Sequence, residues 1–286
     1  MRELTLRAPA KINLTLDILR RRSDGYHDLR MVMQTVSLYD LVTVQTETGT
    51  GDIYVRTSLA ELPNGPGNLA WKAAQAFFDA TGLENNGLEI AIVKQIPVCA
   101  GLAGGSTDGA AVLKALQQLL LPELPEEKLE EIGAQVGSDV PFCIRGGTAL
   151  AEGRGEVLTT LPSMPECWIV LCKPEFGIST PELFGRVRVE ALPFHPDTEG
   201  MRDALAAGEL RTVAQLTGNV FESVLMTEKR EIAAIVRALR DAGALAAAMT
   251  GSGPTVFGVF EEEEKACSAA EQLRGRYTQT YRTEPV

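Results

Sequence analysis

The chain has 286 residues, a formal net charge of −11 and 45% hydrophobic residues. This length suits one large domain or two smaller ones, and the apolar content can supply a packed core. The acidic balance disfavours non-specific binding to nucleic acids or anionic membranes, so a phosphate would need a local pocket of N–H groups or basic side chains.

Cysteine and histidine usage restricts the chemistry further. The five cysteines are scattered and form no C-x-x-C pair, which favours free thiols in a reducing cytoplasm over a zinc site or a disulfide framework. Two histidines, His27 and His195, are too few for a histidine-rich metal centre, and a Ser-His-Asp triad would need one of them. The first ten residues lack the long apolar run of a signal peptide, and no stretch reaches the roughly 18 apolar residues of a membrane span.

Alternating apolar and polar residues open the chain. They predict a strand over residues 12–19, after a shorter one over 4–6. Lys11 and Asn13 lie at the entrance of the longer strand on its polar side, where they can bind a ligand or simply face water. Further strands are expected over residues 31–39, 41–45 and 52–57, the first two broken by Asp40.

An aromatic pair, Tyr26 and His27, follows a basic run at residues 20–22 and a turn at Gly25. Such rings can stack on a nucleobase and read its edge through their polar atoms. The alternative, loop aromatics folded back on the core, agrees equally well with this pair alone.

The stretch Pro97–Asp108 (PVCAGLAGGSTD) joins an apolar run at 88–93 to a helix-forming run at 109–121. A strand, a glycine-rich turn and a helix in this order direct free N–H groups and the positive end of the helix dipole at a phosphate. Ser106 and Thr107 add hydroxyl groups at the helix start, which can cap the helix, hold a phosphate oxygen or reach a metal. The alternative is a plain turn with a good N-cap.

The glycine-rich turn matches neither of the two common phosphate loops. No lysine follows the glycines as in G-x-x-x-x-G-K-[ST], and Ala103 stands where G-x-G-x-x-G has its second glycine. Gly101, Gly104 and Gly105 can still adopt positive φ and let a ligand approach the backbone closely.

Helical periodicity dominates the middle of the chain. One helix is predicted over 69–81, with Asn68 as its N-cap and Gly82 as its C-terminal stop, and another over 126–136. Asp139 then lies in a loop before an apolar stretch, and a lone aspartate in a loop is usually a cap or a turn residue.

A segment with two prolines, 159–166, is the expected domain boundary. Beyond it, Ser179 and Thr180 can cap a helix that carries Phe184. The other elements expected in the second half are strands over 148–151, 167–172, 244–249, 256–260 and 277–282, and helices over 201–206, 210–216, 229–242 and 262–273.

Three motifs together resemble the GHMP small-molecule kinases, the family of galactose, homoserine, mevalonate and phosphomevalonate kinases. They are Ala8–Asn13 (APAKIN), Pro97–Asp108 and Thr250–Thr255 (TGSGPT). Three further blocks narrow the resemblance to members whose substrate carries a cytidine diphosphate group. These blocks are Asp24–His27 (DGYH), Gly137–Pro141 (GSDVP) and Ala151–Glu156 (AEGRGE).

The resemblance implies a two-domain α+β GHMP kinase fold, with domains at 1–160 and 161–286 and the active site in the cleft between them. It implies transfer of a phosphoryl group from ATP, with Mg²⁺, to a hydroxyl of a small molecule that carries cytidine diphosphate. The expected enzyme is a cytoplasmic monomer or homodimer. Phosphoryl transfer depends mainly on positioning and on electrostatic stabilisation, which N–H groups and charged side chains can provide.

The resemblance also implies a role for each motif residue. Asp139 matches the catalytic aspartate, which accepts or orients the proton of the attacking hydroxyl, and Lys11 matches the lysine that stabilises charge beside it. Ser106 is a candidate Mg²⁺ ligand. The residues expected at the nucleotide are Asn68, Pro97, Ala100, Gly101, Leu102, Ala103, Gly104, Gly105, Ser106 and Thr107. Those expected at the substrate are Asn13, Tyr26, His27, Asp139, Thr180, Phe184, Gly251 and Ser252, with two aromatic rings around cytosine and His27 at its edge.

Ala103 departs from the family pattern, which has glycine there, and Thr107 replaces the commoner serine. A positive φ at position 103 would strain the methyl group, whereas a negative φ would make it harmless.

Two other functions compete with this one. Another GHMP kinase would not require the base pocket of Tyr26, His27 and Phe184, and a non-catalytic nucleotide sensor would not require Lys11 and Asp139.

Overall fold

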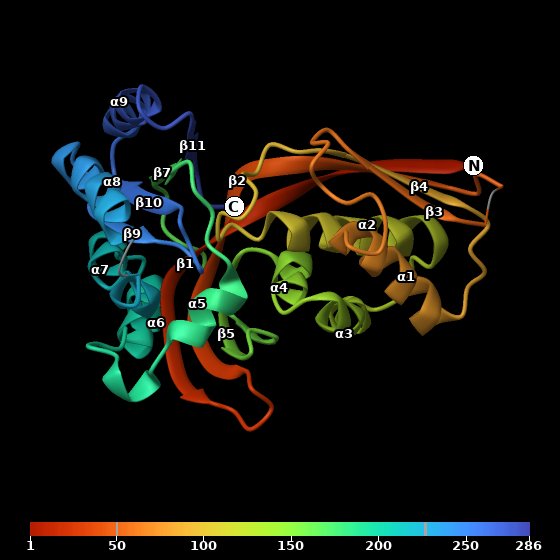
Figure 1. Cartoon of the computed structure of the whole chain (residues 1–286), viewed down its shortest axis with the longest axis horizontal. Coiled ribbons are helices and arrows are strands. Elements are labelled where there is room, and N and C mark those ends of the chain that lie inside the picture. Colours follow the sequence, from red (N-terminus) through yellow and green to blue (C-terminus); the bar gives the residue numbers. More distant parts are fainter. Residues whose placement is uncertain (50, 226–227) are drawn as a thin grey trace. The chain divides into compact units, whose positions relative to one another are not determined.

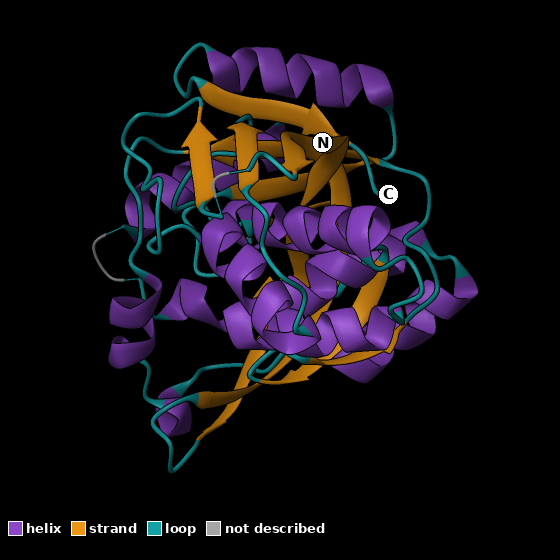
Figure 2. Cartoon of the chain, turned by 90° about the vertical axis from the view of Figure 1, so that its right-hand side faces the viewer, coloured by secondary structure: helices purple, strands orange, loops and turns teal. Residues whose placement is uncertain are grey.

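The computed structural model describes residues 1–49, 51–225 and 228–286 (Figures 1 and 2). The described chain forms two compact units: the first consists of residues 1–10, 39–96 and 103–146, and the second of 11–38, 97–102 and 147–286. Both units are discontinuous because the two longest strands, β1 (Arg2–Arg21) and β2 (His27–Thr46), contribute residues to each. The sequence led us to expect domains at 1–160 and 161–286, and this division stays a prediction.

In the first unit, helices cover one face of a mixed sheet (Figure 1). β4 (Leu88–Val93) pairs antiparallel with the Leu41–Thr46 part of β2 and parallel with β3 (Ile53–Thr57). Every second residue of β4, starting at Leu88, is buried, which is the period-2 pattern of a sheet with one covered face. The helices of this unit are α1 (Leu69–Thr81), α2 (Gly104–Leu120), α3 (Glu126–Val136) and α4 (Val140–Arg145).

The second unit is built on an antiparallel sheet. Its strand order is β11 (Gln279–Thr283), β7 (Trp168–Lys173), β10 (Val256–Phe260) and β9 (Ala246–Met249). The helices α8 (Lys229–Asp241) and α9 (Glu263–Arg274) pack against this sheet (Figure 1). β10 is buried along its whole length, so this strand anchors the core of the unit.

Shorter elements complete the second unit. β5 (Thr148–Gly153) pairs with β6 (Val157–Thr160) and with the Leu29–Gln34 part of β2, and β8 (Gly218–Asn219) pairs parallel with β1. The helical segments are α5 (Thr180–Arg186), η1 (Val189–Ala191), α6 (Thr198–Ala207), α7 (Leu210–Gln215) and η2 (Val220–Ser223). None of the helices in the described ranges combines the length and the apolar character that crossing a bilayer requires.

Local signals predicted several elements with their observed bounds. α1, α3, β4 and β10 begin and end where the sequence indicated. Asn68 caps α1 by accepting a hydrogen bond from the Ala70 N–H at 2.9 Å, and Gly82 ends the helix at a left-handed φ of 69°. Each residue acts on the helix end beside it, within four positions, so the sequence alone located both ends of α1.

The predicted break at Asp40 is wrong, because β2 continues through it. Asp40 is completely buried, and its Oδ1 accepts the N–H groups of Gln95 and Ile96. Its other oxygen accepts a hydrogen bond from Lys94. Aspartate is uncommon in β-strands. Here the strand tolerates it because three donors satisfy the buried carboxylate.

The apolar stretch after Asp139 forms the short helix α4, which the sequence did not predict. Pro141 lies in its first turn, where the missing N–H costs nothing.

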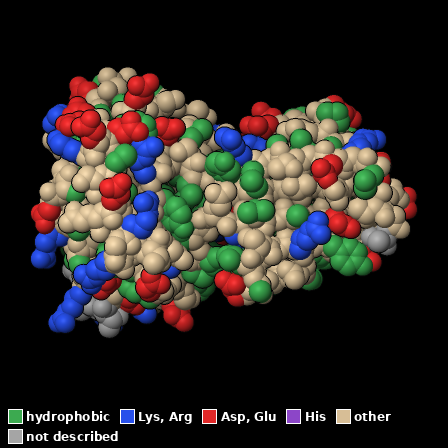
Figure 3. Space-filling model, turned by 90° about the horizontal axis from the view of Figure 1, so that it is seen from above, with side chains coloured by type: hydrophobic (Ala, Val, Ile, Leu, Met, Phe, Trp, Pro, Cys, Tyr) green, Lys and Arg blue, Asp and Glu red, His purple; other side chains and the backbone are tan. Residues whose placement is uncertain are grey.

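Charged side chains of both signs occur on the face of the molecule drawn in Figure 3. On the face drawn in Figure 3, acidic and basic side chains of the described residues are interspersed, so that face presents no broad basic patch to a nucleic acid.

Candidate active site

The glycine-rich stretch crosses the division of the chain, since Pro97–Leu102 belongs to the second unit and Ala103 onward to the first. Three of its residues have left-handed backbone: Cys99 at φ 51°, Gly101 at 75° and Ala103 at 58°. The loop therefore changes direction at alternate residues. The buried members of the loop are Pro97, Ala100 and Leu102.

Gly101 lies directly against the second glycine-rich loop, Thr250–Thr255. A Cβ atom on Gly101 would lie 2.3 Å from Thr250 O, and one on Gly251 would lie 2.8 Å from Gly101 O. Both positions need glycine because contacts this short would push backbone against backbone. The structure thus brings two of the sequence motifs into contact within the second unit.

α2 begins at Gly104, five residues before the predicted start. Its first intrahelical hydrogen bond runs from the Thr107 N–H to Ala103 O at 2.9 Å. The N–H groups of Gly104, Gly105 and Ser106 precede that bond, and such groups have no partner inside a helix. The glycines are therefore the first turn of the helix, and they make this end suitable for a phosphate.

Two hydroxyl groups lie in the same turn. Ser106 is half-buried, whereas Thr107 is buried and its Oγ1 has no hydrogen-bond partner among the described residues. Neither caps the helix, because Ala103 occupies the N-cap position.

The methyl group of Ala103 is held at positive φ, so the departure from glycine costs strain. Left-handed backbone costs a residue other than glycine about 1–2 kcal/mol.

We expect Ala103→Gly to raise the free energy of unfolding by about 0.5–1 kcal/mol, because the added flexibility of glycine offsets part of the gain. Urea denaturation measures this. Ala80→Gly, in the exposed end of α1, is the matched control and should lower stability instead. A destabilising Ala103→Gly would contradict the strain.

A buried charged cluster, which we call the Lys94 cluster, lies below the first turn of α2 and was not predicted. Lys94 Nζ donates to Asp40 Oδ2 and, at 2.6 Å, to Asp108 Oδ2, and all three side chains are at most 5% exposed. A Cβ atom on Gly104 would lie 3.4 Å from Lys94 Nζ. The cluster therefore ties β2, the end of β4 and the start of α2 together within the first unit.

The Lys94 cluster should make stability depend on pH. Burial raises the pKa of Asp108 to about 7, and Asp40 adds to the rise while Lys94 opposes it. The unfolded chain releases this proton near pH 4, so ionisation in the folded state costs free energy and stability falls as pH rises from about 4 to about 7. We expect Asp108→Asn to remove this slope, at most about 1.4 kcal/mol per pH unit, in urea titrations at pH 5, 6, 7 and 8. Other titrating groups contribute equally to both proteins, so their effects cancel in the comparison. Identical slopes in both proteins would contradict the assignment.

Asp139 and Asn68 belong to the first unit. Asp139 is half-buried at the N-terminus of α4, where its side chain makes no capping hydrogen bond. A side-chain cap of α4 is therefore not the role of Asp139. Asn68 does act as a cap, and its Nδ2 also donates to Pro63 O at 2.9 Å, so its side chain serves the start of α1.

Lys11 and Asn13 lie on β1 in the second unit and are buried, at 4% and 1% exposure. Lys11 Nζ donates to Asn13 Oδ1 at 2.7 Å, and the Asn13 N–H donates to Thr250 Oγ1 at 2.9 Å. The Lys11 N–H donates to Leu102 O at 3.2 Å. Hydrogen bonds from the backbone N–H groups of Lys11 and Asn13 thus join this part of β1 to the Pro97–Leu102 segment and to the Thr250–Thr255 loop.

The aromatic residues form a second cluster in the same unit. The His27 ring stacks on Phe184 with centroids 5.2 Å apart, and Phe184 meets Phe221 edge-on at 4.9 Å. Burial, with the nearby charge of Arg21, lowers the pKa of His27, so its imidazole is neutral at neutral pH. Tyr26 is 56% exposed and lies beneath the guanidinium group of Arg154 at 5.1 Å.

Two predicted substrate residues also meet in the second unit. Thr180 Oγ1, at the start of α5, lies 2.7 Å from Ser252 Oγ. This contact places the start of α5 beside the Thr250–Thr255 loop.

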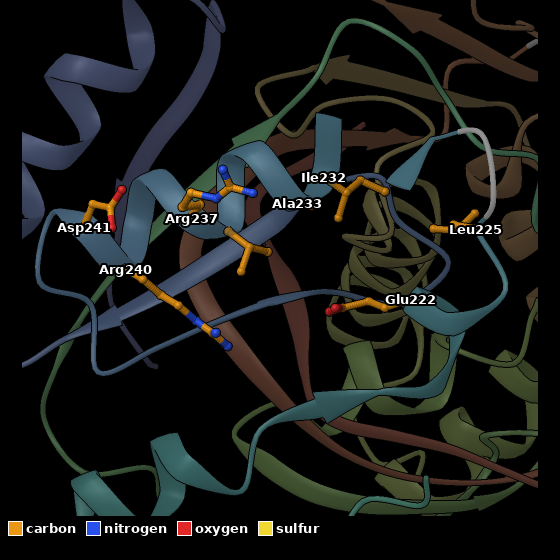
Figure 4. A pocket seen from close by; sticks show the side chains of 8 residues that line it. Glu222, Leu225, Ile232, Ala233, Arg237, Arg240 and Asp241 are labelled. Carbon is orange, nitrogen blue, oxygen red and sulfur yellow. The ribbon is translucent and has the colours of Figure 1, made fainter. Parts of the chain in front are cut away.

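A cavity of about 320 Å³ lies elsewhere in the second unit, against α8 (Figure 4). It contains none of the residues predicted from the motifs. Its lining is Glu222, Leu225, Ile232, Ala233, Val236, Arg237, Arg240 and Asp241. Across the described ranges, no three His, Cys, Asp or Glu side chains come together as a metal site.

Comparisons with known proteins identify the family. Residues 68–147 match the GHMP kinases N-terminal domain, and residues 201–279 match the GHMP kinases C-terminal domain. The chain therefore belongs to the GHMP kinases, as its motifs and its two glycine-rich loops indicate.

Relatives that match nearly the full chain share one name. The chain is 45% identical over 278 residues to a 4-diphosphocytidyl-2-C-methyl-D-erythritol kinase of Exiguobacterium sibiricum, covering 97% of this chain and 96% of the relative. It is 45% identical over 276 residues to the kinase of the same name from Geobacter sulfurreducens, covering 96% of each.

Solved structures agree with this similarity. A crystal structure of 4-(cytidine 5'-diphospho)-2C-methyl-D-erythritol kinase superposes with a TM-score of 0.83 at 32% identity, covering 99% of both chains. Homoserine kinase from Cytophaga hutchinsonii gives a TM-score of 0.77 at 17% identity over 100% of this chain and 95% of that one, which shows a shared fold. The predicted GHMP kinase fold is confirmed as a mixed α/β architecture with two sheets.

Proposed function

We propose that this protein transfers the γ-phosphoryl group of ATP to the 2-hydroxyl of 4-diphosphocytidyl-2-C-methyl-D-erythritol, which gives the 2-phosphate and ADP. This is a step of the non-mevalonate (MEP) route to isoprenoid precursors. The observation that carries the proposal is 45% identity to kinases of this name along 97% of the chain. The chemistry of the two loops and the aromatic cluster supports it.

The proposed catalytic pair is Asp139 and Lys11. Asp139 accepts or orients the proton of the substrate hydroxyl as that oxygen attacks the γ-phosphorus atom. The buried Lys11 ammonium group stabilises negative charge on the transferred phosphoryl group, because a charge out of water acts at low dielectric.

The nucleotide is proposed to bind at the first glycine-rich loop and the start of α2. The N–H groups of Gly104, Gly105 and Ser106 face the phosphates, and the loop ahead of them supplies the close backbone approach. The remaining members of this proposed site are Asn68, Pro97, Ala100, Gly101, Leu102, Ala103 and Thr107.

Mg²⁺ is proposed as the cofactor. The residues present fit this ion, since Mg²⁺ keeps most of its waters, binds mainly to substrate phosphates and needs few protein ligands. Ser106 Oγ is the candidate protein ligand in the first turn of α2, because Ser106 is half-buried whereas Thr107 Oγ1 is fully buried. When bound, the ion neutralises charge on the phosphate oxygens.

The cytidine diphosphate group is proposed to bind in the second unit, and the methylerythritol group beside Asn13 and Asp139. A neutral His27 has one N–H donor and one acceptor nitrogen, which suits the amino group and ring nitrogen of cytosine. Phe184 and Tyr26 are the rings that stack on the base. Thr180, Gly251 and Ser252 are the groups for the diphosphate.

The test is ADP release with Mg-ATP and 4-diphosphocytidyl-2-C-methyl-D-erythritol, in parallel with homoserine, mevalonate and galactose, and with Asp139→Ala as the inactive control. We expect turnover with the cytidyl substrate alone. Turnover with another alcohol would be consistent with a GHMP kinase but would contradict the assignment of Tyr26, His27 and Phe184 to a cytosine pocket. Nucleotide binding with no turnover on any alcohol would favour a sensor.

The stacking role of Phe184 predicts a selective effect. Base stacking on an aromatic ring contributes about 1–3 kcal/mol, so Phe184→Leu should raise the KM for the cytidyl substrate about 10-fold and leave the KM for ATP unchanged. Initial rates at varied concentrations of each substrate measure both. Tyr54→Leu, at an exposed ring of the first unit, should change neither constant. An equal rise in both constants would contradict the assignment of Phe184 to the base.

A further inference from the structure

A buried asparagine that no motif contains lies between the two proposed ends of the cytidine diphosphate site. Asn219 belongs to the two-residue strand β8, pairs with Leu16 of β1 and is 1% exposed. The sequence did not predict β8, because two residues carry no periodic signal.

Both ends of the Asn219 side-chain amide make hydrogen bonds. Nδ2 donates to Met249 O at 2.9 Å and to Gly251 O at 2.8 Å, and Oδ1 accepts from the Phe221 N–H at 3.0 Å. A carboxamide has two N–H donors, and both are spent on the Thr250–Thr255 loop and the strand end before it. A buried amide held by three hydrogen bonds is restricted to one geometry.

These bonds determine where a loop N–H group points. The C=O and N–H of a trans peptide are antiparallel, so the Ser252 N–H points away from Asn219 when Gly251 O points toward it. The Ser252 N–H has no hydrogen-bond partner among the described residues, and Ser252 is half-buried with its Oγ beside Thr180. An unpaired N–H and two hydroxyl groups at one place can bind a phosphate oxygen.

The same asparagine supports the aromatic cluster. Its Oδ1 holds the backbone of Phe221, whose ring packs edge-on against Phe184, and Phe184 stacks on His27. Glu222, which follows Phe221 in the chain, accepts a hydrogen bond from the Met249 N–H at 2.6 Å through Oε1. The Asn219–Glu222 segment therefore binds both the N–H and the C=O of Met249.

We infer that Asn219 is a positioning residue that aims the Ser252 N–H at a phosphate of the substrate and ties this donor to the ring cluster that holds the base. The inference rests on the proposed function for the identity of the ligand. Asn219 itself touches neither the substrate nor the reacting atoms.

The test uses Asn219→Asp in the full chain. The carboxylate keeps an acceptor for the Phe221 N–H, but it loses both donors and faces two carbonyl oxygens. We expect the affinity for cytidine diphosphate to fall at least 10-fold while the affinity for cytidine stays within about 2-fold, both measured by calorimetry or as inhibition constants. Equal losses for both ligands, or no loss for either, would overturn the inference.

A matched control is available in the first unit. Asn85 also donates to a loop carbonyl, Gly51 O at 3.1 Å, and accepts from an N–H two residues later, Gly87 at 3.0 Å. Asn85→Asp should leave both affinities unchanged. Asn219→Ser, which is uncharged and removes the same two donors, should reproduce the selective loss if the aspartate variant does not fold.

Hydrogen exchange tests the positioning without any ligand. The Thr250 N–H donates to Thr255 O, and the Gly253 N–H donates to Thr250 O, both at 2.9 Å. In either Asn219 variant these two amides should exchange at least 10-fold faster, while those of residues 246–248, which Asn219 does not contact, keep their rates. Unchanged exchange in the loop would overturn the inference. If the wild-type protein binds no cytidine diphosphate but the loop amides exchange faster in the variants, the proposed substrate fails and the positioning role stands.

Discussion

Asp139→Asn is expected to lower kcat by about 10²- to 10⁴-fold with little change in nucleotide affinity. The amide cannot accept the proton of the attacking hydroxyl, and it removes the negative charge that orients this group. Since the side chain makes no capping hydrogen bond to α4, the substitution should not unfold the helix. The measurements are kcat with the cytidyl substrate, the dissociation constant of ATP and the midpoint of urea denaturation.

The control for this prediction is Asp203→Asn, at an exposed position of α6. It makes the same chemical change away from every motif, so all three measurements should match the wild type. A kcat for Asp139→Asn within about 3-fold of the wild type would show that the proton of the hydroxyl goes elsewhere, for example directly to a phosphate oxygen.

The largest effect on stability is expected for Lys94→Met. The substitution leaves Asp40 and Asp108 buried together without the ammonium group that both contact. Breaking a buried ion pair by removing one partner typically costs 3–5 kcal/mol, and we expect a loss of this size in the free energy of unfolding at pH 7. Urea denaturation with two optical probes measures it and tests for two-state behaviour.

A surface lysine provides the comparison. Lys128→Met breaks the exposed pair with Glu131, at 2.5 Å, and should cost less than about 1 kcal/mol. Adding Asp108→Asn to Lys94→Met should recover part of the loss, because it removes the carboxyl group whose ionisation beside Asp40 is unfavourable. A loss below about 1 kcal/mol for Lys94→Met would contradict a stabilising role for the Lys94 cluster.

The Lys94 cluster also contacts the backbone that leads into the first glycine-rich loop. Asp40 accepts the N–H groups of Gln95 and Ile96, the two residues that lead into Pro97. The same buried carboxylate therefore orders the entrance to the glycine-rich loop and neutralises Lys94. A buried acidic pair near a proposed phosphate site is thus compatible with anion binding, because Lys94 contacts both carboxyl groups and Asp40 is committed to holding the loop.

The sequence by itself determined the elements whose signals are local. The α1 helix follows from an apolar stripe between a capping asparagine and a terminal glycine, all within 15 residues. The family also followed from the sequence, since its motifs are short stretches such as Pro97–Asp108 that can be read without knowing their neighbours. The proposed roles of Lys11, Asp139 and the ring residues rest on this same resemblance, and they remain predictions.

Only the tertiary structure decided the rest, because the partners are distant in the chain. Asp40 reads as a strand breaker until Lys94, 54 residues later, is seen to satisfy it. Asn219 carries no signal until Met249 and Gly251, about 30 residues away, present their carbonyl oxygens to it. Whether Ala103 was harmless depended on its φ angle, which the first turn of α2 and the loop before it set together. Buried polar groups are stabilised by the partners that folding brings to them, and a sequence lists the groups without pairing them.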